Sequence, residues 1–177
     1  MANSVATFGA GCFWCLESAM NQLHGVTHAI SGYMGGHITN PSYRLVCGGR
    51  TGHAEVVQIT FDDSLISYRQ LCIIFFSLHD PTQLNRQGND IGTQYRSVIF
   101  WHSPEQAEEA EAVVEELTTQ QVFDDDIVTE ISKAAAFYPA EDYHQGYYLA
   151  NPEQGYCQLI VAPKMAKFRQ QFLALLK

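Results

Sequence analysis

The sequence predicts an α+β fold, a two-layer sandwich in which helices cover a sheet and long loops join the elements. Stretches with strand and helix patterns interleave without the regular strand-helix-strand period of a doubly wound sheet. Two turn-rich segments, residues 35–52 and 80–93, are longer than most connections within a compact domain. The 177 residues are enough for one hydrophobic core, so we expect a single domain over residues 1–177.

Five strands are predicted from runs that are rich in strand-forming residues or alternate between apolar and polar side chains. In chain order they cover residues 6–9, 27–33, 55–61, 95–101 and 129–132. The third run alternates most clearly, and it places on one face Glu55, Val57, Ile59 and Phe61. A carboxyl group is therefore expected among apolar side chains on this face of the sheet.

The first two helices are predicted from apolar residues at helical spacing and from the residues that begin and end them. The first covers residues 13–23 and ends near Gly25, a residue type that is common after helices. The second follows the capping pattern Ser67-x-x-Gln70, whose side chains satisfy free backbone groups of the first turn. Its apolar stripe includes Cys72, which we therefore expect in the core.

Three further helices are predicted in the second half of the chain. One starts at Ser103 and Pro104 with an acidic first turn. The residues that it is expected to turn inward are Ala107, Ala110, Val114 and Leu117. A short helix is expected over residues 139–149, and the last helix opens at Pro163. Its expected buried side consists of Met165, Phe168, Phe172 and Leu175.

Acidic residues outnumber basic ones by 19 to 10, which gives a formal net charge of -9. Much of this charge falls in residues 105–116, where we expect a solvated helix face. Nucleic acid and anionic membranes are not expected as partners, because both repel an acidic chain. No apolar run approaches the roughly 20 residues that span a bilayer. Because the first residues lack the features of a signal peptide, we expect a cytoplasmic protein.

Cys12 is the most informative of five cysteines, an odd number that argues against a closed set of structural disulfides. It stands where the first predicted strand gives way to the first helix. Free backbone N–H groups at a helix start favour the thiolate form of a cysteine. Phe13 and Trp14 follow directly and would supply an apolar surface, although they would also suit the buried face of a helix. Cys12 is thus a candidate nucleophile.

Several segments resemble the signature motifs of the peptide methionine sulfoxide reductase A family. In chain order they are residues 11–14 (GCFW), 32–36 (GYMGG), 51–55 (TGHAE), 88–90 (GND), 92–97 (GTQYRS), 140–145 (AEDYHQ) and 155–157 (GYC). The resemblance runs from residue 8 to residue 157. It implies a ferredoxin-like βαβ core and the reduction of the S epimer of methionine sulfoxide, free or within oxidised proteins.

The residues supply the three groups that sulfoxide reduction needs, which are a thiolate, an acid for the oxygen and an apolar site for the methyl group. Cys12 would attack the sulfur. Glu55 would be the acid, kept protonated by its apolar neighbours. Phe13 and Trp14 would hold the methyl group, because aromatic faces make favourable contacts with sulfur.

The resemblance adds three polar residues to this site. Tyr43 and Tyr95 match the two tyrosines of the family that hydrogen-bond the sulfoxide oxygen, and a neutral hydroxyl can donate such a bond. Asp90 matches a residue that supports the substrate site. Without the resemblance, both tyrosines would be interpreted as structural residues.

A second cysteine is needed after the attack, because Cys12 would be left as a sulfenic acid that condenses with another thiol to a disulfide. The resemblance points first to Cys157, whose backbone near Asn151, Pro152 and Gly155 we expect to be mobile. Cys15 stands where the family commonly has glycine, so a direct disulfide between Cys12 and Cys15 is the second route. Cys47 is the third candidate. Thioredoxin would be the reductant in each case, and no bound cofactor is expected.

Two other classes of function stay open. A thioredoxin-like disulfide oxidoreductase would use Cys12 and Cys15 at a helix start and would not need Glu55. A protein that binds methionine sulfoxide without turnover would keep the same pocket. No metal is expected, because a structural zinc needs four ligands at recognisable spacing and only Cys12-x-x-Cys15 shows it. A Rossmann-type nucleotide site has no support, because no Gly-x-Gly-x-x-Gly follows a predicted strand.

Overall fold

A six-stranded mixed sheet forms the centre of the molecule. The structure is a computed structural model that describes residues 3–177, and Met1 and Ala2, which begin the predicted domain, lie outside the described residues. The strands follow the order β7-β6-β1-β3-β2-β8 across the sheet, and all neighbours are antiparallel except β6 and β7. Their bounds are β1 (Asn3–Ala10), β2 (Val26–Met34), β3 (Ala54–Asp62), β6 (Ser97–Trp101), β7 (Glu130–Lys133) and β8 (Tyr138–Pro139).

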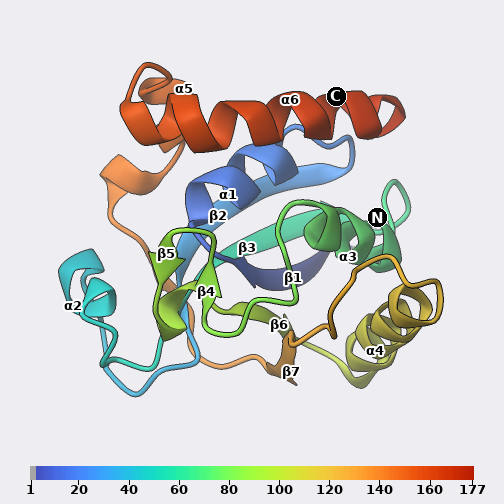
Figure 1. Cartoon of the computed structure of the whole chain (residues 1–177), viewed down its shortest axis with the longest axis horizontal. Helices are drawn as coiled ribbons and strands as arrows, with labels where there is room; N and C mark the ends of the chain where they lie inside the picture. Colours follow the sequence, from blue (N-terminus) through green and yellow to red (C-terminus); the bar gives the residue numbers. More distant parts are fainter. Residues whose placement is uncertain (1–2) are drawn as a thin grey trace.

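Four of these strands and two helices form a ferredoxin-like core. The chain passes through β1, α1 (Phe13–Asn21), β2, β3, α3 (Tyr68–Ser77) and β6, and β3 lies between β1 and β2 in the sheet. This is the split βαβ arrangement of ferredoxin-like folds. Figure 1 shows α6 (Ala162–Gln171) lying across α1, which in turn covers the sheet. The predicted α+β class and the expected core are therefore confirmed.

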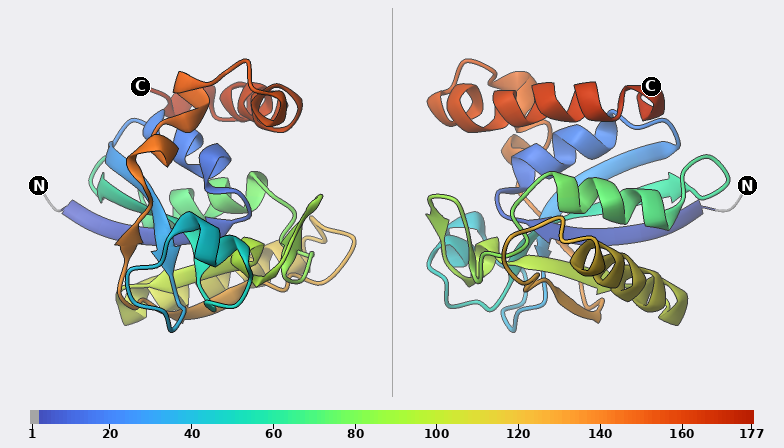
Figure 2. Two further views of the ribbon diagram at one scale, coloured as in Figure 1. Left: turned by 90° about the vertical axis from the view of Figure 1, so that its left-hand side faces the viewer. Right: turned by 45° about the vertical axis from the view of Figure 1, so that its right-hand side comes forward.

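One face of the sheet carries the main hydrophobic core. Buried side chains of α1, α3, α4 (Pro104–Thr119) and α6 (Ala162–Gln171) all belong to it, and both views of Figure 2 show α1 between the sheet and α6. A smaller cluster lies on the other face and consists of Met34, Ala54, Val56, Val98 and Phe100. No helix within residues 3–177 has both the length and the apolar composition needed to cross a bilayer.

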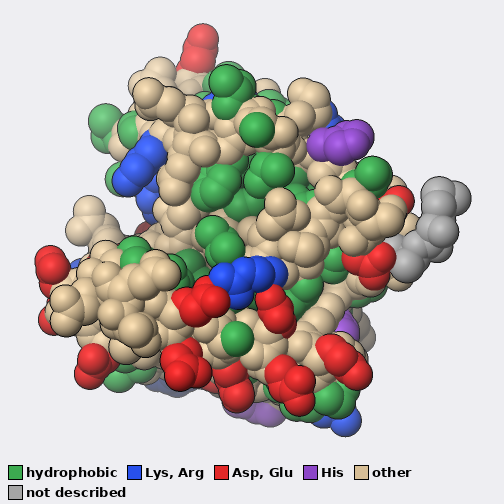
Figure 3. Space-filling model, turned by 90° about the vertical axis from the view of Figure 1, so that its right-hand side faces the viewer, with side chains coloured by type: hydrophobic (Ala, Val, Ile, Leu, Met, Phe, Trp, Pro, Cys, Tyr) green, Lys and Arg blue, Asp and Glu red, His purple; other side chains and the backbone are tan. Residues whose placement is uncertain are grey.

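Helix α4 turns its acidic side to solvent, as expected. Acidic side chains gather over this part of the molecule in Figure 3, and Arg69 of α3 forms ion pairs with Glu109 and Glu116. On its inward side Ala110 is buried, and Val114 and Leu117 pack against the main core, as predicted. Val113, which was not predicted, is buried as well.

The outer edge of β2 is closed mainly by side-chain amides. Strand β8 pairs with only two residues of β2. Further along the edge, the Asn21 carboxamide accepts a hydrogen bond from Ala29 N at 3.0 Å and donates one to Ala29 O at 3.3 Å. The Gln145 carboxamide contacts Ser31 N and O in the same way, at 3.0 and 2.9 Å. Each carboxamide presents a donor and an acceptor as a peptide group does, so these edge groups are satisfied.

Three predicted elements have different bounds or character. Residues 139–149 form a 3-10 turn at Asp142–His144 and the short helix α5 (Tyr147–Ala150), because Gly146 between them has a left-handed φ of 65° that ends the first turn. Strand β6 starts at Ser97, since Thr93–Tyr95 forms a 3-10 turn. The loop over residues 80–93 contains a hairpin of β4 (Arg86–Gln87) and β5 (Asp90–Ile91).

Candidate active site

A cavity of about 200 Å³ brings seven of the predicted site residues together. It lies where the start of α1, the end of the β4–β5 hairpin and α2 (Tyr43–Cys47) meet, at the left of Figure 1. The predicted residues that line it are Cys12, Phe13, Trp14, Tyr43, Glu55, Asp90 and Tyr95. Two further lining residues, Gln154 and Tyr156, were not among the predicted ones. The site therefore draws on segments that are more than 140 residues apart in the chain.

Cys12 occupies the residue just before α1, with an extended backbone at φ -60° and ψ 126°. Its side chain is only partly exposed. Burial raises the pKa of its thiol well above the usual value, and the charges of Glu55 and Cys15 raise it further. A hydrogen bond from the backbone N–H of Trp14 lowers the pKa, as expected at a helix start, but it does not outweigh burial. The helix start therefore favours the thiolate as expected, while burial has the larger and opposite effect on the pKa of Cys12.

Glu55 is a nearly enclosed carboxyl, with 1% of its surface exposed. Its Oε1 accepts a hydrogen bond from the backbone N–H of Phe13 at 3.3 Å, and its Oε2 has no hydrogen-bond partner among residues 3–177. Burial raises the pKa of Glu55 to about 8. The carboxyl is thus mainly protonated at pH 7, as the apolar face of β3 predicts, and its second oxygen is free to carry the proton.

The two tyrosines approach the cavity from short helical turns. Tyr43 begins α2, where the side chain of Ser42 accepts a hydrogen bond from Leu45 N at 3.2 Å, and Tyr95 ends a 3-10 turn. The backbone N–H of Tyr43 donates to Glu141 at 3.0 Å. Burial is the main cause of a raised pKa for both phenols, with the charge of Glu55 adding to it. Both hydroxyls are therefore neutral hydrogen-bond donors across the physiological pH range.

Aromatic rings form the apolar wall of the cavity. Phe13 is buried and lies 5.8 Å from the ring of Tyr33, measured between centroids. Trp14 is half-buried and stacks on Tyr147 at 3.9 Å with an interplanar angle of 10°. The ring of Tyr156 meets the Trp14 indole edge to face, at 79°. Such a wall offers polarizable surface to a methyl group on sulfur.

Asp90 and Tyr156 form a hydrogen-bonded pair at the rim. The Tyr156 hydroxyl donates to Oδ2 of Asp90 at 2.8 Å, which joins the β4–β5 hairpin to the segment before α6. Burial is the main cause of a raised pKa for Tyr156. Tyr156 is the middle residue of the motif at residues 155–157, so the motif could have indicated it as a site residue beside Cys157.

The three cysteines that could condense with a sulfenic acid on Cys12 differ in burial. Cys157 is fully buried and begins a helical turn, Cys157–Val161, that continues into α6. Its N–H donates to the side chain of Gln154 at 3.0 Å. Cys15 is buried in α1, and burial raises its pKa to about 11. Cys47 is exposed at the end of α2, and all of these cysteines are free thiols.

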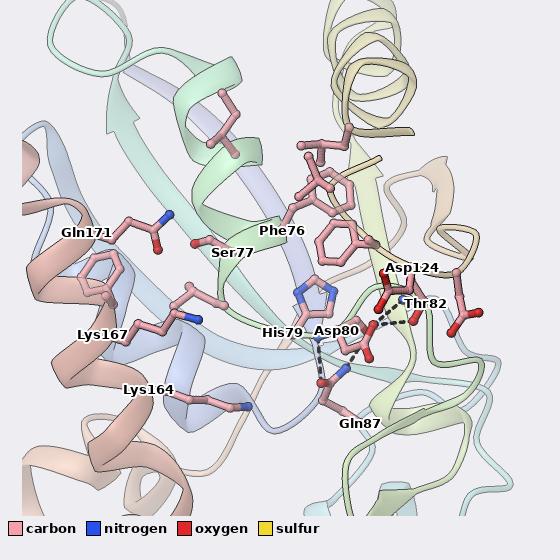
Figure 4. A pocket seen from close by; sticks show the side chains of 17 residues that line it. Phe76, Ser77, His79, Asp80, Thr82, Gln87, Asp124, Lys164, Lys167 and Gln171 are labelled. Atoms are coloured by element: carbon pink, nitrogen blue, oxygen red, sulfur yellow. Dashed lines mark hydrogen bonds between the residues drawn. The ribbon is translucent and has the colours of Figure 1, made fainter. Parts of the chain in front are cut away.

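A larger cavity of about 900 Å³ lies elsewhere, between α3, α6 and residues 122–125. Figure 4 shows Lys164 and Lys167 on one side of it and Asp124 on the other. His79 also lines it, with both ring nitrogens in hydrogen bonds, to Phe75 O and Ser97 Oγ. None of the predicted site residues lines this cavity. Within residues 3–177, no group of three or more His, Cys, Asp or Glu side chains could hold a metal ion.

Comparisons with known proteins agree with the motifs and the geometry. The family model described as peptide methionine sulfoxide reductase matches residues 4–175. Peptide methionine sulfoxide reductase MsrA of Polynucleobacter asymbioticus is 56% identical over 171 residues, which cover 97% of this chain and 90% of that protein.

Solved structures show the same fold. Methionine sulfoxide reductase A of Corynebacterium diphtheriae superposes with a TM-score of 0.81 at 37% identity, over 89% of this chain and 78% of that one. Mxr1 from Saccharomyces cerevisiae in complex with Trx2 superposes with a TM-score of 0.56 at 25% identity, over 82% of this chain and 84% of that one. With its fold and nearly its whole length matched, the chain belongs to the peptide methionine sulfoxide reductase family.

Proposed function

We propose that this protein reduces the S epimer of methionine sulfoxide, free or within oxidised proteins, with Cys12 as the nucleophile. The observation that carries the proposal is the content of one cavity: a thiol, a buried protonated carboxyl, two phenol hydroxyls and an aromatic wall. Membership of the family supports it. Each of these groups has a task in removing oxygen from a sulfoxide.

The first step transfers oxygen from the substrate to the enzyme. The sulfur of Cys12 attacks the sulfoxide sulfur, and the net result is methionine and a sulfenic acid on Cys12. The substrate sulfur is reduced by two electrons and the Cys12 sulfur is oxidised by two, so no outside electron donor is needed for this step. The thiol proton of Cys12 ends on the sulfenic acid, and the atoms balance.

Glu55 makes the oxygen a better leaving group by donating a proton or a strong hydrogen bond to it. Its neutral state also removes the repulsion that an ionised Glu55 exerts on a Cys12 thiolate. Tyr43 and Tyr95 donate to the same oxygen without bringing charge. Phe13 and Trp14 hold the methyl group, while Asp90 and its partner at the rim keep the hairpin in place.

The second half of the cycle removes the sulfenic acid. A second thiol condenses with it, which forms a disulfide and releases water. A dithiol reductant then reduces the disulfide by two electrons and restores both thiols. We assign the second thiol to Cys157, with Cys15 as the alternative, and the reductant to thioredoxin in the cytoplasm. The solved complex of the related Mxr1 with Trx2 supports the choice of reductant.

The proposal is tested by incubating the reduced protein with the separated S and R epimers of a peptide methionine sulfoxide and dithiothreitol. Methionine is expected from the S epimer alone. Release from neither epimer by a folded, reduced protein would overturn the proposal and favour disulfide exchange between Cys12 and Cys15. Binding of the S epimer without release would instead identify a binding protein.

Substitution of Tyr43 or Tyr95 by phenylalanine is expected to slow methionine release about tenfold in each case, because one hydrogen bond to the developing charge on oxygen is lost. The double variant is expected to lose more than either single one. The measurement is the single-turnover rate with excess enzyme. Tyr148→Phe is the matched control, because Tyr148 lies outside this cavity. Rates equal to wild type in both single variants and in the double variant would remove the tyrosines from the mechanism.

Substitution of Cys157 by serine is expected to leave the first methionine release intact and to stop thioredoxin-dependent turnover. The sulfenic acid on Cys12 should then persist, and dimedone labelling with mass spectrometry measures it. Because Cys157 is fully buried in a helical turn, its reaction with Cys12 requires residues 154–158 to open. Persistence of the sulfenic acid in Cys15→Ser or Cys47→Ser instead would assign the role to that cysteine, and Cys72→Ser is the control because Cys72 lies in the core.

A further inference from the structure

The motif at residues 140–145 places one imidazole behind the wall of the cavity. His144 is 1% exposed, and its Nδ1 lies 3.2 Å from Nε1 of the Trp14 indole. Its ring also packs on Tyr43 at 4.3 Å and on Phe13 at 5.2 Å between centroids. Three residues that line the cavity therefore contact a single side chain that does not line it.

The hydrogen bond fixes where the proton of His144 sits. An indole nitrogen only donates, so Nδ1 must offer a lone pair to Trp14. A neutral imidazole then carries its hydrogen on Nε2, which is buried and has no partner among residues 3–177. Burial lowers the pKa of His144, against an opposing effect of Glu141, so the neutral ring is the resting form.

The backbone around His144 is anchored on both sides. Its N–H donates to Glu141 O at 2.9 Å. The Gln145 carboxamide that caps the edge of β2 also donates to Ala140 O at 3.2 Å. Gly146 N donates to both carboxyl oxygens of Glu17, at 2.8 and 3.1 Å, and Glu17 is 3% exposed. The ring therefore has a fixed position from which it can hold Trp14.

We propose that His144 is a positioning residue that holds the Trp14 indole in the orientation that binds the substrate methyl group. The proposal rests on the proposed function, and it assigns no proton transfer to His144. Loss of the acceptor leaves only the ring contacts, such as those with Tyr147 and Tyr156, to hold the indole in this orientation. Substrate binding is therefore weakened, while the reacting groups at Cys12 and Glu55 stay in place.

Two substitutions of similar size separate the acceptor from the volume that it fills. In His144→Asn the side-chain oxygen can take the place of Nδ1, whereas His144→Leu fills space without accepting a hydrogen bond. We expect KM for a peptide sulfoxide to rise about tenfold in His144→Leu, the loss of one hydrogen bond, with kcat within twofold. His144→Asn is expected to restore KM to within about threefold of wild type.

The fluorescence of Trp14 gives a readout that does not depend on turnover. The chain has two tryptophans, so Trp101→Phe leaves Trp14 as the only source of tryptophan emission. In that background, acidification below the ordinary histidine pKa of about 6.5 should change the emission, because a protonated Nδ1 no longer accepts from the indole. The neighbouring groups that face this ring are Glu141, Tyr43 and Tyr143.

The same emission change should be absent from His144→Asn, which has nothing to titrate at this position, while Glu141→Gln should keep it at a lower midpoint. An unchanged KM and unchanged emission in folded His144→Leu would overturn the proposal. Equal losses of kcat in the Asn and Leu variants would also overturn it, because a purely structural role does not distinguish the acceptor. Failure of the reductase activity itself would leave the fluorescence result intact.

Discussion

Replacement of Cys12 by serine is expected to lower methionine release by more than about 10³-fold, because a hydroxyl is a far weaker nucleophile than a thiolate. The protein should stay folded, since the side chain of Cys12 is not fully buried and the substitution removes little volume. The measurement is single-turnover methionine release from the S epimer, together with a circular dichroism spectrum.

Cys15→Ser is the matched control, because Cys15 is the neighbouring thiol one turn further along α1. It should release the first methionine at the wild-type rate. If both variants lost this first release equally, the two thiols would act as a redox pair, as in a thioredoxin-like disulfide oxidoreductase. A loss confined to Cys12 supports direct attack on the sulfoxide.

Replacement of Glu55 by glutamine is expected to lower the rate of sulfoxide reduction by about 10²- to 10³-fold, the usual contribution of a positioned acid. In wild type this rate should fall as the pH rises through about 8, since Glu55 then ionises, loses its proton and repels the Cys12 thiolate. This decrease in rate with rising pH should be absent in Glu55→Gln. An unchanged rate in the glutamine and alanine variants would remove the acid role.

Stability provides a second check on Glu55 that is independent of catalysis. Its pKa is higher in the folded state than the value of 4.5 for a free carboxyl, so the folded protein binds more protons between about pH 4.5 and 8. The free energy of unfolding of wild type should therefore fall over this range. Because Glu55→Gln lacks this decrease, its free energy of unfolding at pH 9 should exceed that of wild type by on the order of 2 kcal/mol. Urea titration measures the difference.

The parts of the site that follow local rules could be predicted from the sequence. Cys12 stands at a junction of strand and helix, and Glu55 lies on an apolar face of an alternating strand. The raised pKa of Cys12 could not be predicted, because a helix start is a local feature and the burial that outweighs it comes from distant segments. His144 lies 130 residues from Trp14, and only the fold brings them together.

The fold shows the same division between local and distant causes. The five predicted strands are present because alternation and strand-forming residues act within a few positions. The helix expected over residues 139–149 fails at Gly146, whose left-handed backbone is tied to the carboxyl of Glu17. Cys157 lies in a helical turn because that turn continues into α6, which packs on α1. Neither cause can be recognised from the residues alone.

The amide-capped edge of β2 affects how the enzyme can meet other polypeptide chains. Oxidised proteins are often partly unfolded, and an open strand edge would pair with their exposed backbones. Asn21 and Gln145 already occupy the donors and acceptors of that edge. An extended chain that approaches this edge therefore finds the backbone donors and acceptors of Ala29 and Ser31 already occupied.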